Sequence, residues 1–109
     1  MKIAVIGGKD FSNKEAAKKV MLRMPKDAVI LHGGRQGTDR ICKAAAEQIG
    51  MKTKELRSDW KRYGKAADSI RDAEMIGVAD MLLVFPGGRE TEICVNRAQE
   101  KNIPTVIIR

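Results

Sequence analysis

The sequence has few of the residues that bind metals or form disulfides. Its 109 residues include two cysteines, Cys42 and Cys94, and one histidine, His32. Neither cysteine lies in a C-x-x-C pair or beside the histidine, so the spacing indicates no zinc site, and we expect no metal or cofactor. Both cysteines fall on apolar positions of predicted helices, where a buried free thiol is the usual state. Free thiols suit a reducing compartment.

The chain also lacks long apolar runs, linkers and repeats. No stretch approaches the ~20 apolar residues that cross a bilayer. The N-terminus runs directly into a predicted strand, MKIAVIGG, without a signal-peptide pattern. We therefore expect a cytoplasmic protein with no membrane partner. The length suits one domain over residues 1–109.

Negative charge is scarce. The 21 lysines and arginines outnumber the 14 aspartates and glutamates, which gives a net charge of +7. Such a balance favours anionic partners, such as nucleotides or nucleic acid. The cations are spread along the chain rather than gathered in a tract, so a solvated basic surface is the alternative interpretation.

Short apolar runs alternate with helical patterns. Strands are predicted over 2–6, 28–32, 52–56, 80–85 and 104–108. Four of these are continuous apolar runs, which is typical of parallel strands covered on both faces. The run 52–56 (KTKEL) is rich in lysine and suits a sheet edge. Right-handed crossovers then predict an α/β fold with a doubly wound parallel sheet of strand order 3-2-1-4-5.

Helices are predicted between the strands. Ser12 and Glu15 have the spacing of a capping box at the start of the first helix, which Pro25 ends. Further helices are predicted over 38–49, 65–78 and 90–101.

The helix over 65–78 carries a pair of charges beside its packing stripe. Ile70, Ala73 and Gly77 form the predicted stripe, and Arg71 and Glu74 lie on a neighbouring face. The charged pair is either a surface ion pair or part of a site, because the helix leads into the fourth strand.

Three predicted strands each end in a pair of glycines. Ligands of such sheets bind beyond the carboxyl ends of the strands. Each glycine segment also enters a helix N-terminus, whose amides favour anions. One such turn can simply join a strand to a helix, but three at one edge predict a ligand site. The candidate residues are Gly7, Gly8, Lys9, Asp10, Phe11, Gly33, Gly34, Arg35, Gly37, Thr38, Asp39, Arg40, Pro86, Gly87, Gly88, Arg89, Glu90 and Thr91.

The polar residues around the second glycine segment also have structural explanations. His32 has the side chain of an acid or base, but no partner is placed beside it, which favours a structural role. Thr38 suits the N-cap of a helix, and Asp39 suits the helix dipole. Arg35 and Arg40 remain available for a phosphate.

Only four aromatic residues occur, and none lies in a predicted helix core. Phe11 and Phe85 stand at the exits of the first and fourth strands, and Trp60 and Tyr63 lie in the loop after the third. Their position at the carboxyl edge predicts stacking on a flat ligand. The alternative is a small hydrophobic cluster under a long loop. Trp60 and Tyr63 are therefore further ligand-binding candidates.

Together these segments resemble the SLOG superfamily of Rossmann-like proteins, named for the Smf/DprA and Lonely Guy families. The resemblance is to its YspA-like branch and rests on IAVIGGKDF, LHGGRQGTDR, DWKRYGKAADSIRDAEM and ADMLLVFPGGRET. It covers the whole chain in order. It implies a single Rossmann-like sheet, a nucleotide-derived ligand at the carboxyl edge, and homo-oligomers.

The Lonely Guy enzymes of this superfamily are phosphoribohydrolases. Their motif is similar to arginine-x-x-glutamate-methionine, alanine-aspartate and then PGGxGTxxE, and the matching residues here are Arg71, Glu74, Met75, Ala79, Asp80, Pro86, Gly87, Gly88 and Thr91. Two positions depart from it. Glu90 replaces a glycine, and Ile93 or Cys94 stands where the acidic residues would fall. The candidates for a hydrolytic role are therefore Arg71, Glu90 and Glu92.

Glu90 and Glu92 bear on where a phosphate would bind. Acids in a first helical turn stabilise the helix by about 0.3–1 kcal/mol each, but they repel a phosphate on the same terminus. We therefore expect the phosphate at Gly33–Gly37, beside Arg35 and Arg40, with Glu90 at the ribose hydroxyls.

Three functions follow. The first is binding of an ADP-ribose-like molecule or nucleotide messenger by a sensor or a sequestering protein, such as a phage-encoded sponge. The second is hydrolysis of an N-glycosidic bond, in which Arg71 holds the substrate and Glu90 or Glu92 stabilises the oxocarbenium ion. The third is binding of single-stranded nucleic acid through Trp60 and Tyr63. We favour the first, because the catalytic set is incomplete.

Overall fold

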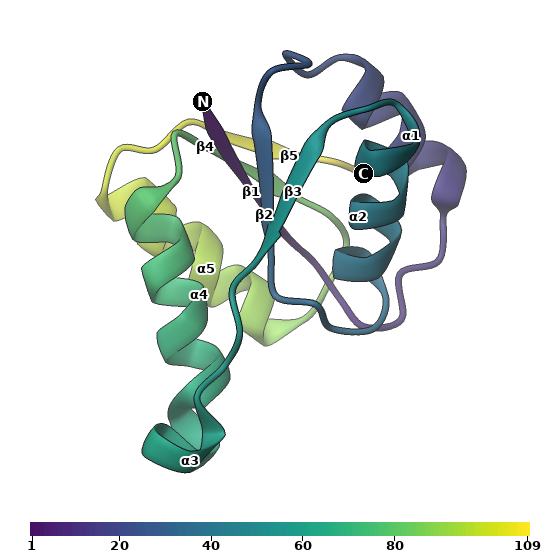
Figure 1. The fold of residues 1–109 in the computed structure, drawn as a ribbon. Coiled ribbons are helices and arrows are strands. Elements are labelled where there is room, and N and C mark those ends of the chain that lie inside the picture. Colours follow the sequence, from purple (N-terminus) through teal and green to yellow (C-terminus); the bar gives the residue numbers. More distant parts are fainter.

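The computed structural model describes residues 1–109 and contains one five-stranded parallel sheet (Figure 1). The strands are β1 (Lys2–Ile6), β2 (Val29–His32), β3 (Lys52–Glu55), β4 (Met81–Val84) and β5 (Thr105–Ile107). Their spatial order is β3-β2-β1-β4-β5, and every neighbouring pair is parallel. The predicted fold class and strand order are confirmed.

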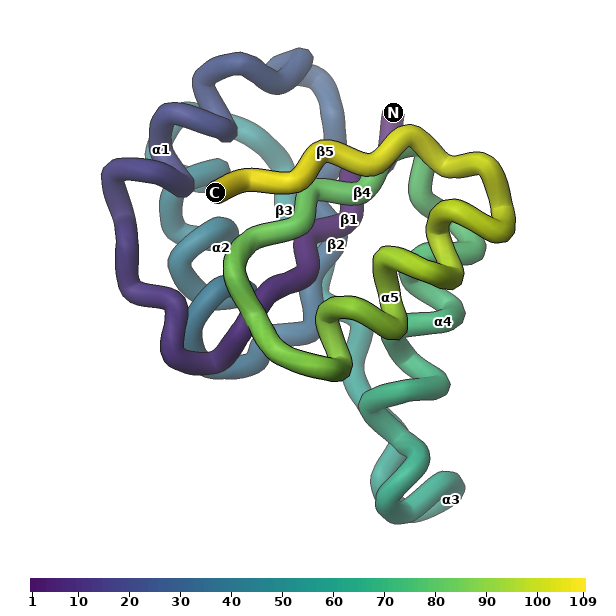
Figure 2. The backbone as a smooth tube through the Cα atoms, turned by 180° about the vertical axis from the view of Figure 1, so that it is seen from behind, coloured from purple at the N-terminus to yellow at the C-terminus, as the bar shows by residue number.

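Helices cover both faces of the sheet. They are α1 (Lys14–Leu22), α2 (Thr38–Gln48), α3 (Trp60–Tyr63), α4 (Ala67–Val78) and α5 (Arg89–Glu100), and a 3-10 turn, η1 (Gly64–Ala66), joins α3 to α4. The pair α1 and α2 lies on one side and the pair α4 and α5 on the other (Figures 1 and 2). None of the helices combines the length and apolar character needed to span a bilayer.

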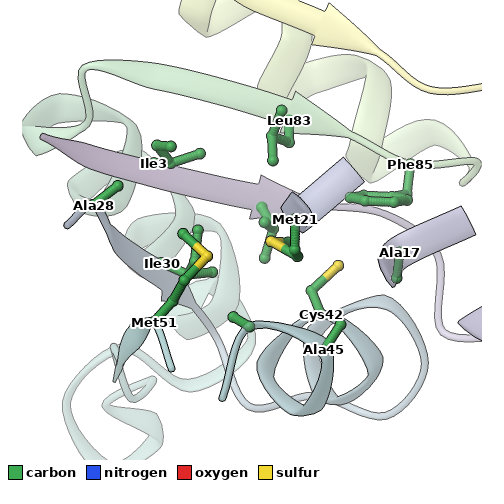
Figure 3. Packing of buried hydrophobic residues seen from close by; sticks show 12 residues of the cluster. Ile3, Ala17, Met21, Ala28, Ile30, Cys42, Ala45, Met51, Leu83 and Phe85 are labelled. Carbon is green, nitrogen blue, oxygen red and sulfur yellow. The ribbon is translucent and has the colours of Figure 1, made fainter. Parts of the chain in front are cut away.

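Two hydrophobic clusters explain why the strands are apolar on both faces. Ile3 and Val5 of β1 join the cluster under α1 and α2, which Figure 3 shows. Ala4 and Ile6, the alternate residues of the same strand, join the cluster under α4 and α5. Successive side chains of a strand point to opposite faces, so a strand covered on both sides needs an unbroken apolar run.

The two edges of the sheet differ. β3 lies at one edge, and its Lys52, Lys54 and Glu55 are exposed, as the lysine-rich run predicts. β5 lies at the other edge and carries no charged residue.

Two predicted helix caps are wrong. The N-cap of α1 is Asn13 rather than Ser12, and its Oδ1 accepts a hydrogen bond from the amide of Ala16 at 3.0 Å. The N-cap of α2 is Gly37 rather than Thr38. Thr38 instead donates its hydroxyl to the carbonyl oxygen of Gly8 at 2.9 Å, because packing of the two loops brings that acceptor within reach.

The predicted packing stripe of α4 is also wrong. Gly77 is exposed, and the buried residues of this helix are Ala67, Arg71, Asp72, Met75 and Ile76. At about 100° of rotation per residue, these residues centre on the side of α4 roughly opposite to the predicted stripe, of which Ile70 and Ala73 are only partly buried. The reason is that Arg71 and Asp72 pair with each other inside the protein, which an apolar pattern does not register.

Candidate functional site

The three glycine segments meet beyond the carboxyl ends of β1, β2 and β4. The amide of Gly8 donates to the carbonyl oxygen of Pro86 at 2.9 Å, and the amide of Thr38 donates to that of Gly8 at 3.2 Å. Gly37 has φ +84°, and a Cβ there would collide with the carbonyl of Lys9. Most of these glycines therefore serve first to let the segments pack backbone against backbone.

A cavity of about 1110 Å³ opens between the segments. Small-molecule sites occupy roughly 300–1,000 Å³, so the cavity has room for a nucleotide. Carboxylates outnumber cations on its wall, where the charged residues are Asp10, Asp39, Asp68, Asp72 and Glu90 against Lys9, Arg35 and Arg89. The wall thus has the opposite charge balance to the whole chain and offers many hydrogen-bond acceptors.

Most of the residues predicted to bind a ligand line this cavity. They are Gly7, Gly8, Lys9, Asp10, Phe11, Arg35, Asp39, Pro86, Gly87, Gly88, Arg89, Glu90 and Thr91. The other predicted residues lie outside its wall: Gly33, Gly34, Gly37, Thr38, Arg40, Trp60, Tyr63 and Arg71. Among the catalytic candidates, Glu90 lines the cavity, whereas Arg71 and Glu92 do not.

Sequence reasoning misses part of the wall. The additional lining residues are Ile6, Ser12, Asn13, Gln36, Asp68 and Asp72. Four of these adjoin the predicted segments, and a wider window around each glycine pair would have included them. Asp68 and Asp72 are spaced i, i+4 on α4, which puts them on one helix face. Nothing in the sequence, however, shows that this face borders the cavity.

The Gly33–Gly37 segment does not offer the amides expected to bind a phosphate. The amides of Gly33 and Arg35 both donate to Oδ2 of Asp39 at 3.2 Å. The amide of Gly34 donates to Nδ1 of His32 at 3.1 Å. Asp39 is buried and thus acts as an internal anion for this loop. A phosphate at the same place would have to displace it.

Arg35 connects three elements at the cavity wall. Its Nε lies 3.6 Å from Asp39, its Nη2 3.7 Å from Asp72 of α4, and its Nη1 3.4 Å from Glu90 of α5. Burial lowers the pKa of Arg35, but attraction by these carboxylates outweighs it and the pKa lies above its usual value. Arg35 is therefore a permanent cation. Its bond to Glu90 is the shortest of the three, but the Glu90 side chain is 82% exposed, so water weakens this pair the most.

Burial and ion pairing act on the pKa of Asp39 in opposite directions. Burial raises its pKa above the usual value, although the guanidinium and the amide of Arg35 both act in the opposite direction. Its oxygen Oδ2 is already occupied by two amides. The position on the cavity wall is thus structural in the first place.

Arg71 lies beneath the cavity wall and is 3% exposed. Its Nε donates to Asp72 at 2.8 Å, and its Nη1 donates to the carbonyl oxygens of Gly33 at 3.1 Å and Leu56 at 3.3 Å. Its ion pairs are with Asp68 and Asp72, so a surface pair with Glu74 is excluded. Arg71 holds two loops onto α4 and does not face the cavity.

The start of α5 offers amides at the cavity wall that no side chain caps. Gly88 is its N-cap, no side chain caps the first turn, and a Cβ at Gly88 would meet nothing within 4 Å. Arg89 and Thr91 of this turn line the cavity. None of the ion pairs involves Arg89 or Lys9. Amides and an available cation therefore meet here.

The aromatic residues do not form one stacking platform. Phe85 is buried in the core, and Phe11 packs against it with ring centroids 5.2 Å apart. Phe11 also lines the cavity, whereas Trp60 and Tyr63 form α3, away from its wall. The four aromatic residues therefore do not share one surface, because the segment after β3 turns outward before α4 begins (Figure 1).

The remaining reactive side chains are buried. Cys42 and Cys94 are free thiols, as predicted, and burial raises the pKa of both, that of Cys94 to about 12. His32 is 1% exposed, and burial lowers its pKa despite the nearby Asp39 and Glu55. Since Nδ1 accepts from Gly34, the proton of the neutral ring lies on Nε2, which has no partner. None of the three lines the cavity.

Comparisons with known proteins identify related sequences and structures. The sequence model of the YspA, cpYpsA-related SLOG family (YAcAr) matches residues 1–63. The Gene 61 protein of Mycobacterium phage D29 is 40% identical over 92 residues, which cover 77% of this chain and 74% of that protein.

Two solved structures share the fold. DNA processing protein A (DprA) from Streptococcus pneumoniae superposes with a TM-score of 0.81 at 21% identity, over 99% of this chain and 50% of that one. The chain thus spans half the length of DprA. The protein TM1055 superposes with a TM-score of 0.73 at 16% identity, over 95% of this chain and 71% of that one.

Proposed function

Because the chain belongs to the YspA, cpYpsA-related SLOG family, we propose that its cavity binds a nucleotide-derived ligand and that the protein acts as a sensor or a sequestering protein. The observation that carries the proposal is the uncapped N-terminus of α5 within a large cavity at the carboxyl edge of the sheet. Such edges bind ligands in open α/β sheets.

The phosphate of this ligand sits at the start of α5 rather than at Gly33–Gly37, although the carboxylates of Glu90 and Glu92 in the same first turn weaken its binding. The amides of Gly33, Gly34 and Arg35 already have acceptors within the chain. The turn that begins at Gly88 has no side-chain cap, and Arg89 adds a cation. A phosphate there replaces the weak contact between Glu90 and Arg35 with contacts to two guanidinium groups.

The rest of the ligand faces carboxylates. Asp10 is an exposed residue of the wall, and Asp68 is half-buried on α4. Carboxylate oxygens accept hydrogen bonds from ribose hydroxyls, as acidic residues do in dinucleotide folds. Phe11, half-buried beside Phe85, presents an apolar surface for a base. An ADP-ribose-like ligand has the hydroxyls, phosphate and base that this wall accommodates.

Binding without turnover fits the geometry better than hydrolysis. Hydrolysis of the Lonely Guy kind requires Arg71 to hold the substrate, but its guanidinium is buried and bonded to Asp72, Gly33 and Leu56. Glu92 is exposed and outside the cavity wall, and Glu90 pairs with Arg35. No activated nucleophile is added by the cysteines, whose thiols are buried.

Ligand extraction tests the proposal. Purified protein is measured by native mass spectrometry, and the extract is then analysed by mass spectrometry for nucleotides. We expect a nucleotide-derived compound that is returned chemically unchanged after incubation. Recovery of a cleaved base or sugar would show turnover and remove the sequestering role.

A pair of variants locates the ligand. Arg89→Glu places a carboxylate at the start of α5, and we expect nucleotide binding, measured by isothermal titration calorimetry, to weaken at least tenfold. Arg23→Glu makes the same change of charge in an exposed residue at the end of α1 and leaves the affinity unchanged. Equal affinities for Arg89→Glu and the parent protein would exclude the phosphate site at α5.

A further inference from the structure

Trp60 and the cations around it form an exposed projection that the cavity does not use. We define the α3 projection as residues 57–65. In Figures 1 and 2 it extends beyond the end of α4, away from the sheet. Trp60 is the only tryptophan of the chain and is 57% exposed. An indole left in water forgoes burial worth roughly 1.5–3 kcal/mol, the value for other large apolar side chains. Packing alone therefore gives no reason for its position.

The projection is ordered by local contacts rather than by a core. Oδ1 of Asp59 caps α3 by accepting a hydrogen bond from the amide of Arg62 at 3.1 Å. The hydroxyl of Ser58 donates to Asp68 of α4. The guanidinium of Arg62 lies 5.1 Å from the centre of the Tyr63 ring, which is a cation–π distance. These contacts hold the backbone of α3 and the guanidinium of Arg62 in place within the chain.

The charge of the projection is strongly positive. It carries Arg57, Lys61, Arg62 and Lys65, and its only carboxylate is Asp59. Lys61, Arg62 and Lys65 are all exposed and take part in no ion pair. Asp59 is engaged as the cap of the helix. An exposed indole surrounded by unpaired cations is complementary to a polyanion that carries flat groups.

We propose that the α3 projection binds single-stranded nucleic acid. Trp60 stacks on an unpaired base, and Lys61, Arg62 and Lys65 contact the phosphates on either side. A single strand is the fitting partner, because stacking needs a base that is not paired. The four residues of α3 span only about 6 Å at 1.5 Å per residue, too little to read a major groove. The surface is separate from the cavity, so the proposal does not depend on the nucleotide ligand.

The lone tryptophan makes the contact directly observable. A single-stranded oligonucleotide of about 12 nucleotides is long enough to cover the projection, since single-strand binding sites span about 4–16 nucleotides. We expect it to quench the emission of Trp60 in proportion to binding measured by fluorescence anisotropy of the labelled strand. DNA and RNA strands are run in parallel, because stacking and phosphate contacts are common to both. Between about 50 and 200 mM salt, three or four phosphate contacts predict roughly 20- to 50-fold weaker binding.

Variants separate stacking from charge. Trp60→Ala should weaken anisotropy-detected binding roughly 5- to 150-fold, the equivalent of one stacked base, and Trp60→Phe should restore part of it. Lys61→Glu with Arg62→Glu should weaken it at least tenfold and lower the salt dependence. The control with the same charge change is Arg23→Glu with Lys26→Glu, on exposed residues at the opposite end of the sheet, and it should bind like the parent protein.

Several outcomes would overturn the proposal. One is strand binding without a change in Trp60 emission, and another is equal loss in the two charge-reversal variants, which would indicate non-specific attraction. A third is that Trp60→Ala lowers the mass seen by analytical ultracentrifugation but leaves strand binding intact, which would assign the projection to a second copy of the chain. Circular dichroism of each variant verifies folding. Because Trp60 is exposed, its replacement should leave the fold intact.

Discussion

At the scale of single residues, the glycines of the site divide into those that pack and the one that faces open space. Gly37 has a positive φ and touches the backbone of Lys9, whereas a Cβ added at Gly88 would meet no other atom within 4 Å. The same residue type thus has a folding role at one position and borders the open cavity at the other.

This difference predicts that two alanine variants differ in stability. Gly37→Ala should lower the free energy of unfolding by roughly 2–5 kcal/mol, because it adds both backbone strain and overpacking. Gly88→Ala should change it by no more than about 0.5 kcal/mol. Urea unfolding monitored by circular dichroism measures both. A Gly37→Ala protein as stable as its parent would show that the two loops do not pack tightly against each other.

His32 gives a pH dependence with a definite sign. Burial lowers the pKa of the folded state below the usual 6.5, so the unfolded chain binds more protons below about pH 6.5. The contribution of His32 to stability is therefore complete above that pH and is lost as the pH falls towards the folded pKa.

The variant His32→Asn tests this sign. Asparagine retains an acceptor for the amide of Gly34 but cannot titrate. We expect the variant to lose less stability than its parent between about pH 7.5 and about pH 5.5, in urea unfolding at each pH. The comparison is of the two pH-dependent losses of stability, so titrating groups far from His32 cancel, whereas Asp39 and Glu55, which interact with His32, do not. Identical differences would contradict a buried neutral histidine.

At the scale of elements, helix starts depend on one side chain at a specific place. Asn13 caps α1 through its Oδ1, although the spacing of Ser12 and Glu15 predicts the preceding residue. Ser12 and Asn13 are both good capping residues, so the local sequence does not decide between them.

The reassigned cap leads to a matched pair of variants. Asn13→Ala should lower the free energy of unfolding by about 1 kcal/mol, because the amide of Ala16 loses its acceptor. Ser12→Ala should have an effect within about 0.5 kcal/mol. Thermal and urea unfolding detect the difference. If Ser12→Ala proved the more damaging change, the predicted capping box would form in solution after all.

Elements also differ in how far pattern determines their orientation. The strand predictions are correct because both faces of the sheet are apolar, so the sequence did not have to indicate which face of a strand is buried. α4 required such a choice, and its buried Arg71 and Asp72 lead apolar periodicity to the wrong face. A charged residue is usually predicted to be exposed, and only the structure shows that Arg71 and Asp72 pair in the interior.

At the scale of the whole molecule, Arg71 links parts of the chain that are distant in sequence. It joins α4 to the loop after β2 through Gly33 and to the loop after β3 through Leu56. It also pairs with Asp72, which in turn contacts Arg35 on the cavity wall. The guanidinium of Arg71 therefore holds together the segments that form the cavity wall.

Arg71→Met should destabilise the protein by about 3–5 kcal/mol, because Asp72 is left as a buried charge with a weaker partner. Arg71→Lys should recover only part of this, since an ammonium does not reproduce the fork of hydrogen bonds. Guanidinium unfolding measures the loss. A cost of less than about 1 kcal/mol for Arg71→Met would mean that the network is not needed for folding.

The sequence by itself determined the sheet, its strand order and the edge at which the glycine segments meet. It could do so because strand periodicity, crossover handedness and loop chemistry are local or topological rules. Only the tertiary structure decided which amides of those segments remain available. Asp39 accepts hydrogen bonds from the amides of Gly33 and Arg35, which lie six and four residues before it in the sequence. The first turn of α5, in contrast, has no side-chain cap.

The tertiary structure also decided which residues share a surface. Asp68 and Asp72 join the cavity, whereas Trp60 and Tyr63 leave it and stand on the α3 projection. The physical reason is that the direction of a helix and the rotation of its face are set by packing and buried charge pairs between distant segments. A linear pattern of apolar residues does not record those distant contacts.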